Sequence, residues 1–188
     1  MAPSVVIEGC EMHLEDRVLG LLDAEKPYIE IIDGRGQEKL VSPEWPHSRA
    51  QSTLSRIFSE YADRVGGDTG VELRFVVDAV TLLPDVSYYS ESQMQDMGET
   101  EKRYPRRSPY AAIEVRSSDD RPGERERKMN LYLTLGSRVV LDVDPKRETL
   151  TTIDAAGSRV YAKDETFEHV ALPGLHIDLA PFFARVNP

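Results

Sequence analysis

The chain has almost no cysteine and no long apolar run, and each absence removes a class of protein. Cys10 is the single cysteine among 188 residues, so no intramolecular disulfide can form and no cysteine-rich zinc site is available. No apolar run approaches the roughly 20 residues that a membrane-spanning helix needs. The N-terminus shows no basic segment followed by an apolar core, so we expect no signal peptide. The sequence predicts a cytoplasmic protein without a membrane partner.

Positive charge is also scarce. The chain has 23 Lys and Arg against 33 Asp and Glu, which gives a formal net charge of −10. Such a protein repels nucleic acid, whose binding depends on phosphate contacts. The distribution is uneven, because the stretch from Lys102 to Lys128 holds nine basic and five acidic residues, a local excess of four positive charges. We interpret this stretch as a phosphate-binding face around the candidate site.

The remaining composition is that of one globular domain. Hydrophobic residues make up 40% of the chain and charged residues 30%, which is typical of a soluble protein with its own core. We predict a single domain over residues 1–188, with an N-terminal extension and helix at 1–27 and a core at 28–183.

Apolar periodicity predicts strands alternating with helices. The expected strands are 5–7, 28–32, 38–42, 71–77, 80–89, 110–116, 138–143, 148–153 and 158–161, and the expected helices are 11–22, 46–65, 121–136 and a closing turn at 181–185. The strand–helix–strand order from Tyr110 to Val143 predicts a crossover unit, and therefore an α/β (α+β) fold with a mixed sheet. The polar stretch 90–108 predicts a long mobile loop near the site, and Asp144 before Pro145 predicts a turn.

Two carboxylates lie in strand-like segments. Asp85 follows Pro84 in LPDVSYY (83–89), and Glu114 lies in AAIEVR (111–116), which is apolar on both sides of it. A carboxylate in a buried strand needs a partner or an ion. Mg²⁺ binds few carboxylates and keeps several waters, and it lowers the pKa of the water that attacks a phosphodiester. The alternative is that Asp85 shapes a turn and Glu114 is a paired surface charge.

Lys128 supplies an amine close to these carboxylates. Positions 128, 131, 132 and 135 share one face of the predicted helix, and Leu131, Tyr132 and Leu135 make that face apolar. Lys128 therefore points toward the sheet, where it could act as a base or stabilise negative charge on the phosphate. Two alternatives stay open: the side chain snorkels past the edge of the core, or it pairs with Glu124 one turn earlier.

The order of these motifs resembles the Uma-two-type restriction endonucleases of the PD-(D/E)xK nuclease superfamily. The matching segments are YIEIIDG at 28–34, PDV at 84–86, IEVRS at 113–117, the helical lysine with a tyrosine four residues on, VDP at 143–145 and LPGL at 172–175. The resemblance implies a restriction-endonuclease-like mixed sheet flanked by helices. It also implies a metal-dependent endonuclease that hydrolyses phosphodiester bonds in nucleic acid, with DNA favoured over RNA, and a homodimer.

The resemblance assigns roles to residues as well. It implies that Asp85, Glu114 and Lys128 are catalytic, and that Asp85, Glu114 and the backbone carbonyl of Val115 bind Mg²⁺ or Mn²⁺. The superfamily's usual lysine lies two residues after the glutamate, where this chain has Arg116. An arginine is a poor proton carrier but a good phosphate clamp, so the resemblance implies that the lysine has moved to the helix.

Three further residues are accessory candidates. Glu30 matches an acidic position of the family's first strand and could contribute to the metal pocket, with a solvated surface charge equally open. His47 could bind substrate or assist proton transfer near pH 7, although a structural role at a helix start is favoured. Tyr132 could hydrogen-bond near the site, although a core position is favoured.

Two departures from the family and two other functions remain. Asp142 replaces an apolar position, which predicts a strand nearer the sheet edge, and Arg116 replaces the expected leucine.

The chain could instead be a catalytically inactive nuclease-fold module that binds nucleic acid or a protein partner. It could also be a metal-dependent phosphoesterase for a small nucleotide, because an acidic surface repels a small anion less than a long duplex.

Overall fold

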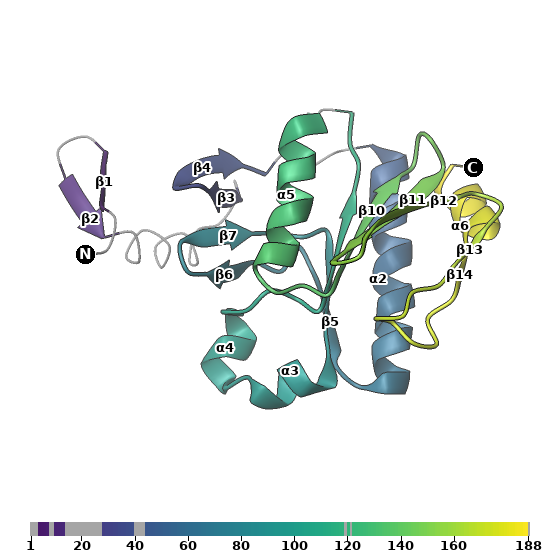
Figure 1. The fold of residues 1–188 in the computed structure, drawn as a ribbon, viewed down its shortest axis with the longest axis horizontal. Helices are drawn as coiled ribbons and strands as arrows, with labels where there is room; N and C mark the ends of the chain where they lie inside the picture. The colour runs from purple at the N-terminus through teal and green to yellow at the C-terminus, as the bar shows by residue number, and fades with distance from the viewer. Residues whose placement is uncertain are drawn as a thin grey trace.

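The structure is a computed structural model that describes residues 4–7, 10–13, 28–39, 44–118, 120 and 122–187. Groups of strands are separated by helices along the chain (Figure 1). The elements up to the centre of the chain are β1 (Ser4–Ile7), β2 (Cys10–His13), β3 (Ile29–Ile32), β4 (Arg35–Glu38), α2 (Trp45–Val65), β5 (Asp68–Val71), β6 (Phe75–Val77), β7 (Val80–Leu82), β8 (Val86–Tyr89), α3 (Glu91–Asp96) and α4 (Glu99–Arg103). The elements that follow are β9 (Ala111–Val115), α5 (Pro122–Thr134), β10 (Val139–Asp144), β11 (Thr149–Asp154), β12 (Gly157–Ala162), β13 (Thr166–Phe167), β14 (Ile177–Asp178) and α6 (Leu179–Val186).

The central layer is a six-stranded sheet with the order β12-β11-β10-β9-β8-β5. β9 and β10 are parallel, and the other neighbours are antiparallel. α5 connects the two parallel strands, which is the crossover that such a pair requires. The predicted mixed sheet flanked by helices is therefore confirmed.

The two faces of this sheet are covered by different elements. α2 packs on β5, β8 and β9 and also contacts α6, whereas α5 packs on β10 and β11; Figure 1 shows α2 and α5 on either side of the sheet. Side chains alternate along a strand, and Ala111, Ile113 and Val115 belong to the core under α2. Ala112 belongs to the core under α5. Glu114 therefore faces α5.

A second sheet has the order β4-β3-β7-β6. Its β3–β4 hairpin turns at Asp33 and Gly34, whose φ angles of 51° and 72° suit a two-residue turn with both central residues left-handed. The returning strand follows this turn directly at Arg35–Glu38. The predicted return at 38–42 was thus placed too late along the chain, and residues 40–42 lie outside the described ranges.

Two predicted strands are each divided between the two sheets. The stretch 71–77 forms β5 and β6, with Glu72 between them at a φ of 48°. The stretch 80–89 forms β7 in the four-stranded sheet and β8 in the six-stranded sheet. Pro84 has no N–H to donate to a strand ladder, so pairing stops there and the chain crosses from one sheet to the other. Asp85 lies at this crossing.

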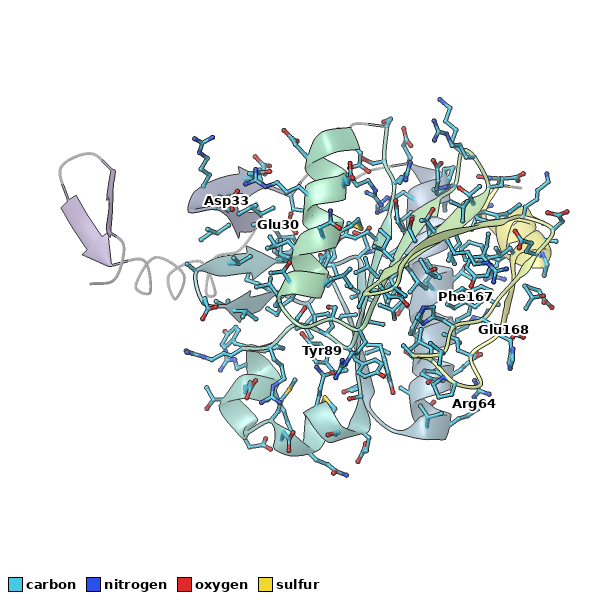
Figure 2. The ribbon with its side chains drawn as sticks, viewed as in Figure 1. Glu30, Asp33, Arg64, Tyr89, Phe167 and Glu168 are labelled. Carbon is cyan, nitrogen blue, oxygen red and sulfur yellow. The ribbon has the colours of Figure 1, made fainter. Side chains whose placement is uncertain are left out.

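The predicted mobile loop at 90–108 contains two short helices, α3 and α4. Ser90 and Gln93 form a capping box at the start of α3, each side chain bonding the backbone of the other. Both helices follow the end of β8 that lies away from Asp85, and Figure 2 labels Tyr89 at that end. The position near the site was therefore wrong. Part of the basic stretch is neutralised locally, because Lys102 pairs with Glu99, and Arg107 with Glu101.

The N-terminal prediction is partly corrected. β1 confirms the strand at 5–7 and pairs with β2 in an antiparallel hairpin. Residues 11–13, predicted to begin a helix, belong to β2, and the rest of that predicted helix lies outside the described residues. Within the described part of the chain, no helix combines the length and apolar character needed to cross a membrane.

Candidate active site

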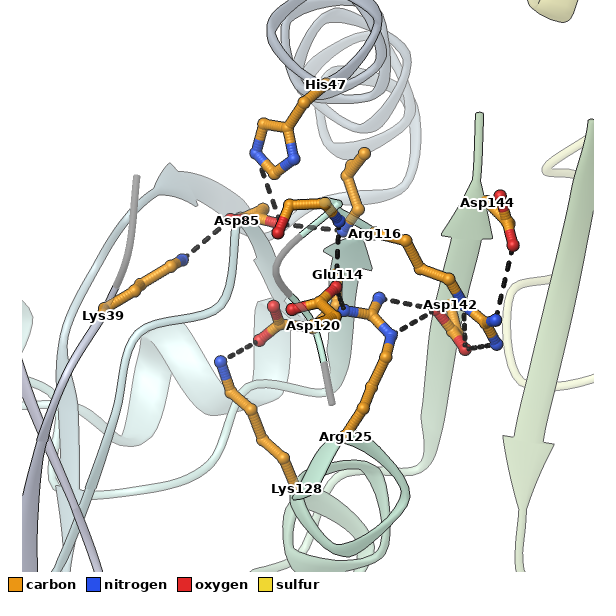
Figure 3. A network of polar contacts seen from close by, with 12 residues as sticks. Lys39, His47, Asp85, Glu114, Arg116, Asp120, Arg125, Lys128, Asp142 and Asp144 are labelled. Atoms are coloured by element: carbon orange, nitrogen blue, oxygen red, sulfur yellow. Dashed lines mark hydrogen bonds and ion pairs between the residues drawn. The ribbon is translucent and has the colours of Figure 1, made fainter. Parts of the chain in front are cut away.

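Asp85 is buried at the crossing between the two sheets. Its Oδ2 accepts a hydrogen bond of 2.7 Å from the backbone N–H of Val115, which ties the crossing to β9. Its Oδ1 accepts a bond of 2.7 Å from Nζ of Lys39, and the same ammonium donates to the carbonyl of Leu83 at 2.6 Å. Burial alone would raise the pKa of Asp85, but Lys39 and, to a smaller extent, His47 lower it below its ordinary value. Asp85 is thus held as a charged carboxylate (Figure 3).

Lys128 lies between two glutamates. Its Nζ is 2.8 Å from Oε1 of Glu30 on β3 and 2.8 Å from Oε1 of Glu114 on β9. One turn further along α5, the hydroxyl of Tyr132 donates to the same oxygen of Glu114 at 2.5 Å. Glu30 is fixed by a further bond of 2.8 Å from the backbone N–H of Leu83. The helix face of Lys128 points toward the sheet, as the sequence predicts.

Burial and charge move the pKa values of this cluster in different directions. Burial lowers the pKa of Lys128, but Glu114 and Glu30 outweigh it and raise the pKa above its ordinary value. Burial raises the pKa of Glu114, and Lys128 only partly offsets this. Asp85 and Glu114 therefore have pKa values shifted in opposite directions, an arrangement found where two carboxylates have different chemical roles.

These groups face one cavity of about 150 Å³. The lining residues are Glu30, Ile32, Gln37, Glu38, Lys39, His47, Asp85, Glu114, Val115, Ser117, Asp120, Glu124, Arg125 and Lys128. Of the eight site candidates from the sequence, the lining includes Glu30, Asp85, Glu114, Lys128, His47 and Val115, and it leaves out Arg116 and Tyr132. Figure 3 shows that the labelled members come from several strands, helices and loops. The fold therefore gathers side chains that are up to about a hundred residues apart in the chain.

His47 approaches Asp85 from the first turn of α2. Its Nε2 lies 3.8 Å from Oδ2 of Asp85, and its buried Nδ1 has no hydrogen-bond partner in the described part of the chain. One turn on, Gln51 donates to the backbone carbonyl of Asp85 at 3.2 Å. The start of α2 therefore closes the cavity on the side of Asp85.

Arg116 does not turn toward Lys128. Its guanidinium pairs with Asp142 at 2.6 Å and with Asp144 at 3.3 Å, and Arg125 holds the other oxygen of Asp142 at 2.5 Å. β10 lies between β9 and β11, so the predicted edge position of Asp142 is wrong. An acid is tolerated in this interior strand because two arginines compensate it; they lower its pKa against the effect of burial.

Comparison with known proteins identifies the family. The family model Uma2, described as “Putative restriction endonuclease”, matches residues 15–180. The chain belongs to the Uma2 family. Membership supports a nuclease role, and it agrees with the resemblance carried by the motifs around Asp85, Glu114 and Lys128.

One solved structure shows the same fold. A “putative nuclease belonging to DUF820” from Anabaena variabilis superposes with a TM-score of 0.81 at 19% identity, covering 93% of this chain and 99% of that one. A DrdV–DNA complex matches with a TM-score of 0.41 at 15% identity, covering 71% of this chain and 11% of that one. No curated protein matches the chain.

The side chains of this Uma2 site can be compared with the ligands that divalent metals use. Within the described ranges, no three acidic, histidine or cysteine side chains converge on a single point. Asp85 and Glu114 are two carboxylates on one cavity, and Mg²⁺ binds few carboxylates and keeps several waters. The cavity of about 150 Å³ has the volume of several waters at about 30 Å³ each. The residues present fit a hydrated divalent ion.

Lys39 is the site residue that the sequence analysis missed. In the observed hairpin, Glu30 lies opposite Gln37, and the N–H of Lys39 continues the pairing by donating to the carbonyl of Tyr28 at 2.7 Å. Residues 37 and 39 share a face because side chains alternate. A hairpin built directly on the Asp33–Gly34 turn would have placed Lys39 beside Glu30, whereas a strand starting at residue 38 hid this relationship.

Proposed function

We propose that this Uma2-family protein is a metal-dependent endonuclease that hydrolyses phosphodiester bonds in nucleic acid, with DNA as the favoured substrate. The supporting observation is that Asp85, Glu114 and Lys128 face a single cavity although they come from a sheet crossing, a central strand and a helix. Family membership supports the nuclease role. The two carboxylates and the lysine supply the chemical groups that phosphodiester hydrolysis needs.

In this proposal Asp85, Glu114 and the backbone carbonyl of Val115 hold Mg²⁺ or Mn²⁺. When bound, the ion polarises the phosphate and lowers the pKa of the attacking water. The chain contributes the positioning. The N–H of Val115 fixes one oxygen of Asp85, and the hydroxyl of Tyr132 fixes one oxygen of Glu114. Both carboxylates are therefore already held in place before the metal ion or the substrate binds.

Lys128 has the role of a charge stabiliser rather than a base. Its ammonium is held between Glu30 and Glu114 and remains a cation in the cavity. A cation placed where negative charge develops on a phosphate lowers the barrier without reorganisation. Glu30 then has a positioning role, because it bonds the same ammonium as Glu114.

The remaining candidates have smaller roles in the proposal. His47 lies beside Asp85 with a free ring nitrogen in the described structure and is suited to contact substrate or water. Arg116 holds β10 against β9 through Asp142, so its contribution to phosphate binding is indirect. A cytoplasmic homodimer completes the proposal, since cleavage of both strands of a duplex suits two-fold symmetry; light scattering of the purified protein measures its mass in solution.

The experiment combines calorimetric titration of Mg²⁺ and Mn²⁺ with plasmid nicking on the same samples. The samples are wild type, Asp85→Asn, Lys128→Met and the control Lys102→Met, which removes an exposed charge on α4. We expect Asp85→Asn to lose metal binding and nicking, Lys128→Met to lose nicking, and Lys102→Met to match wild type. Nucleic-acid binding by wild type that survives EDTA, without metal binding or nicking, would instead identify a catalytically inactive module. Hydrolysis of small nucleotides alone would identify a phosphoesterase.

A further inference from the structure

The ammonium of Lys39 is held in a fixed place within the candidate site. Its side chain is only 9% exposed, and Nζ donates to the carbonyl of Leu83 at 2.6 Å and to Oδ1 of Asp85 at 2.7 Å. The backbone of Lys39 is also fixed, by its bond to Tyr28 across the β3–β4 hairpin. The side chain of Lys39 is therefore a fixed part of the site.

The two acceptors of Lys39 are of the kind that a divalent ion uses. Mg²⁺ and Mn²⁺ bind carboxylate and backbone carbonyl oxygens, and Lys39 bonds one of each. The second oxygen of Asp85 already accepts the N–H of Val115. Oδ1 is the oxygen of Asp85 that this backbone bond does not fix, and Lys39 bonds it.

The two lysines of the site compensate different acids. Lys128 pairs with Glu30 and Glu114, whereas Lys39 pairs with Asp85. A buried carboxylate without a cation is costly. Apart from His47 at 3.8 Å, Lys39 is the cation that the described structure places on Asp85. Asp85 can therefore stay ionised and buried without any metal.

We infer that Lys39 is a resident counter-ion of the metal site, which occupies Oδ1 of Asp85 in the metal-free protein and leaves it when the metal binds. This inference rests on the proposed metal-dependent function. The flexible four-carbon stem of lysine lets the ammonium move within the cavity that it lines. Metal affinity is then the result of competition between two cations for one carboxylate.

The charge of the site supports keeping this lysine. The cavity is lined by six carboxylates and three cationic side chains, so its formal charge is −3, and a divalent ion would bring it to −1. Without Lys39 the loaded site would carry −2. The lysine therefore weakens metal binding but reduces the repulsion of an anionic substrate once the metal is in place.

The test is calorimetric titration of Mn²⁺ into wild type, Lys39→Met, Lys39→Gln and the control Lys102→Met at one ionic strength. We expect Lys39→Met to bind Mn²⁺ about tenfold or more tightly than wild type, because close charge pairs couple at least this strongly. Lys39→Gln keeps a donor for the Leu83 carbonyl but removes the charge, so it should also bind Mn²⁺ more tightly than wild type. Lys102→Met removes the same charge far from the cavity and should bind as wild type does.

Thermal unfolding gives a second readout that does not depend on activity. We expect Lys39→Met to melt below wild type without metal and to gain more in melting temperature when Mn²⁺ is added, because the ion replaces the missing cation. Equal or weaker Mn²⁺ binding by Lys39→Met, while wild type binds, would overturn the inference alone. Absence of Mn²⁺ binding by every variant, wild type included, would overturn both the inference and the proposed function.

Discussion

The ammonium of Lys128 on α5 and the carboxylate of Glu114 on β9 lie 2.8 Å apart. Their side chains are 15% and 5% exposed, so neither has free access to water. α5 is the crossover between β9 and β10, and the same connection that makes the sheet mixed therefore sets the position of Lys128. Removal of Lys128 leaves two buried acids without their shared cation, whereas removal of Glu114 leaves Lys128 paired with Glu30.

Lys128→Met is expected to reduce both stability and activity. Glu30 and Glu114 would remain buried without a shared cation, which costs about 3 kcal/mol in the free energy of unfolding. Nicking should fall at least about a hundredfold, as when one charge stabiliser is removed from an active site. Urea unfolding and plasmid nicking measure the two effects. Arg127→Met, the next position on α5, removes only a surface pair with Asp33 and should cost less than about 1 kcal/mol; equal losses in both variants would contradict the assignment.

Tyr132→Phe isolates one hydrogen bond. The ring packs beside Phe75 with centroids 6.0 Å apart, and phenylalanine preserves this contact. Loss of the bond to Glu114 should cost about 1 kcal/mol of stability and lower the rate of nicking. Tyr88→Phe removes a comparable bond to the carbonyl of Gly66, far from the cavity, and should cost similar stability with no loss of nicking. Unchanged nicking in Tyr132→Phe would show that the bond has no part in the reaction.

Asp142→Asn is expected to change stability in a pH-dependent way. The pKa of Asp142 lies below its ordinary value of 3.8 in the folded protein, because Arg116 and Arg125 outweigh the effect of burial. A lowered folded pKa gives stability that is present above about pH 4 and is lost as the pH falls through the folded value. The variant should be about 3 kcal/mol less stable at pH 7, and this difference should shrink below pH 3.8. Urea unfolding at pH 7, 5 and 3 measures it, and a constant difference would contradict the ion-pair explanation.

Gly67→Ala tests the close approach of two backbones beside α3. A Cβ at this position would lie 2.2 Å from the carbonyl oxygen of Tyr89, and the φ of 101° is itself unfavourable for alanine. Gly174 also has a positive φ, 80°, but a Cβ there meets nothing within 4 Å. Gly174→Ala should therefore cost about 1 kcal/mol of backbone strain, and Gly67→Ala clearly more. Equal melting temperatures for the two variants would show that the backbone at Gly67 moves without cost.

Much of the fold could be predicted because the spacing of apolar residues and the order of the segments indicate it. The helical spacing of Leu54, Phe58 and Tyr61 marks α2, and the order of β9, α5 and β10 implies the crossover. The split between β7 and β8 could not be read from composition, since it depends on which distant strand each segment pairs with. The short helices at 90–108 had a local signal, Ser90 followed by Gln93 three residues on, which is the capping-box spacing.

In the site, too, the features set by local patterns could be predicted and those set by distant pairing could not. Helix periodicity was sufficient to point Lys128 at the sheet, and strand alternation accounts for the direction of Glu114. The returning strand of the first hairpin was predicted at the wrong residues, and Lys39 was therefore not identified as a site residue. The partner of Arg116 lies 26 residues further along, at Asp142, on a strand whose neighbours the sequence did not determine.

The β3–β4 hairpin gives the site an unusual sensitivity to length. Glu30 and Lys39 stand on its two arms, and one is an acid while the other is a cation of the cavity. A slip of one residue in a strand turns every side chain to the opposite face. A single insertion or deletion at the Asp33–Gly34 turn could thus withdraw a charged group from the cavity without substituting any residue that lines it. The turn, which carries no chemistry of its own, governs the charge of the site through its length.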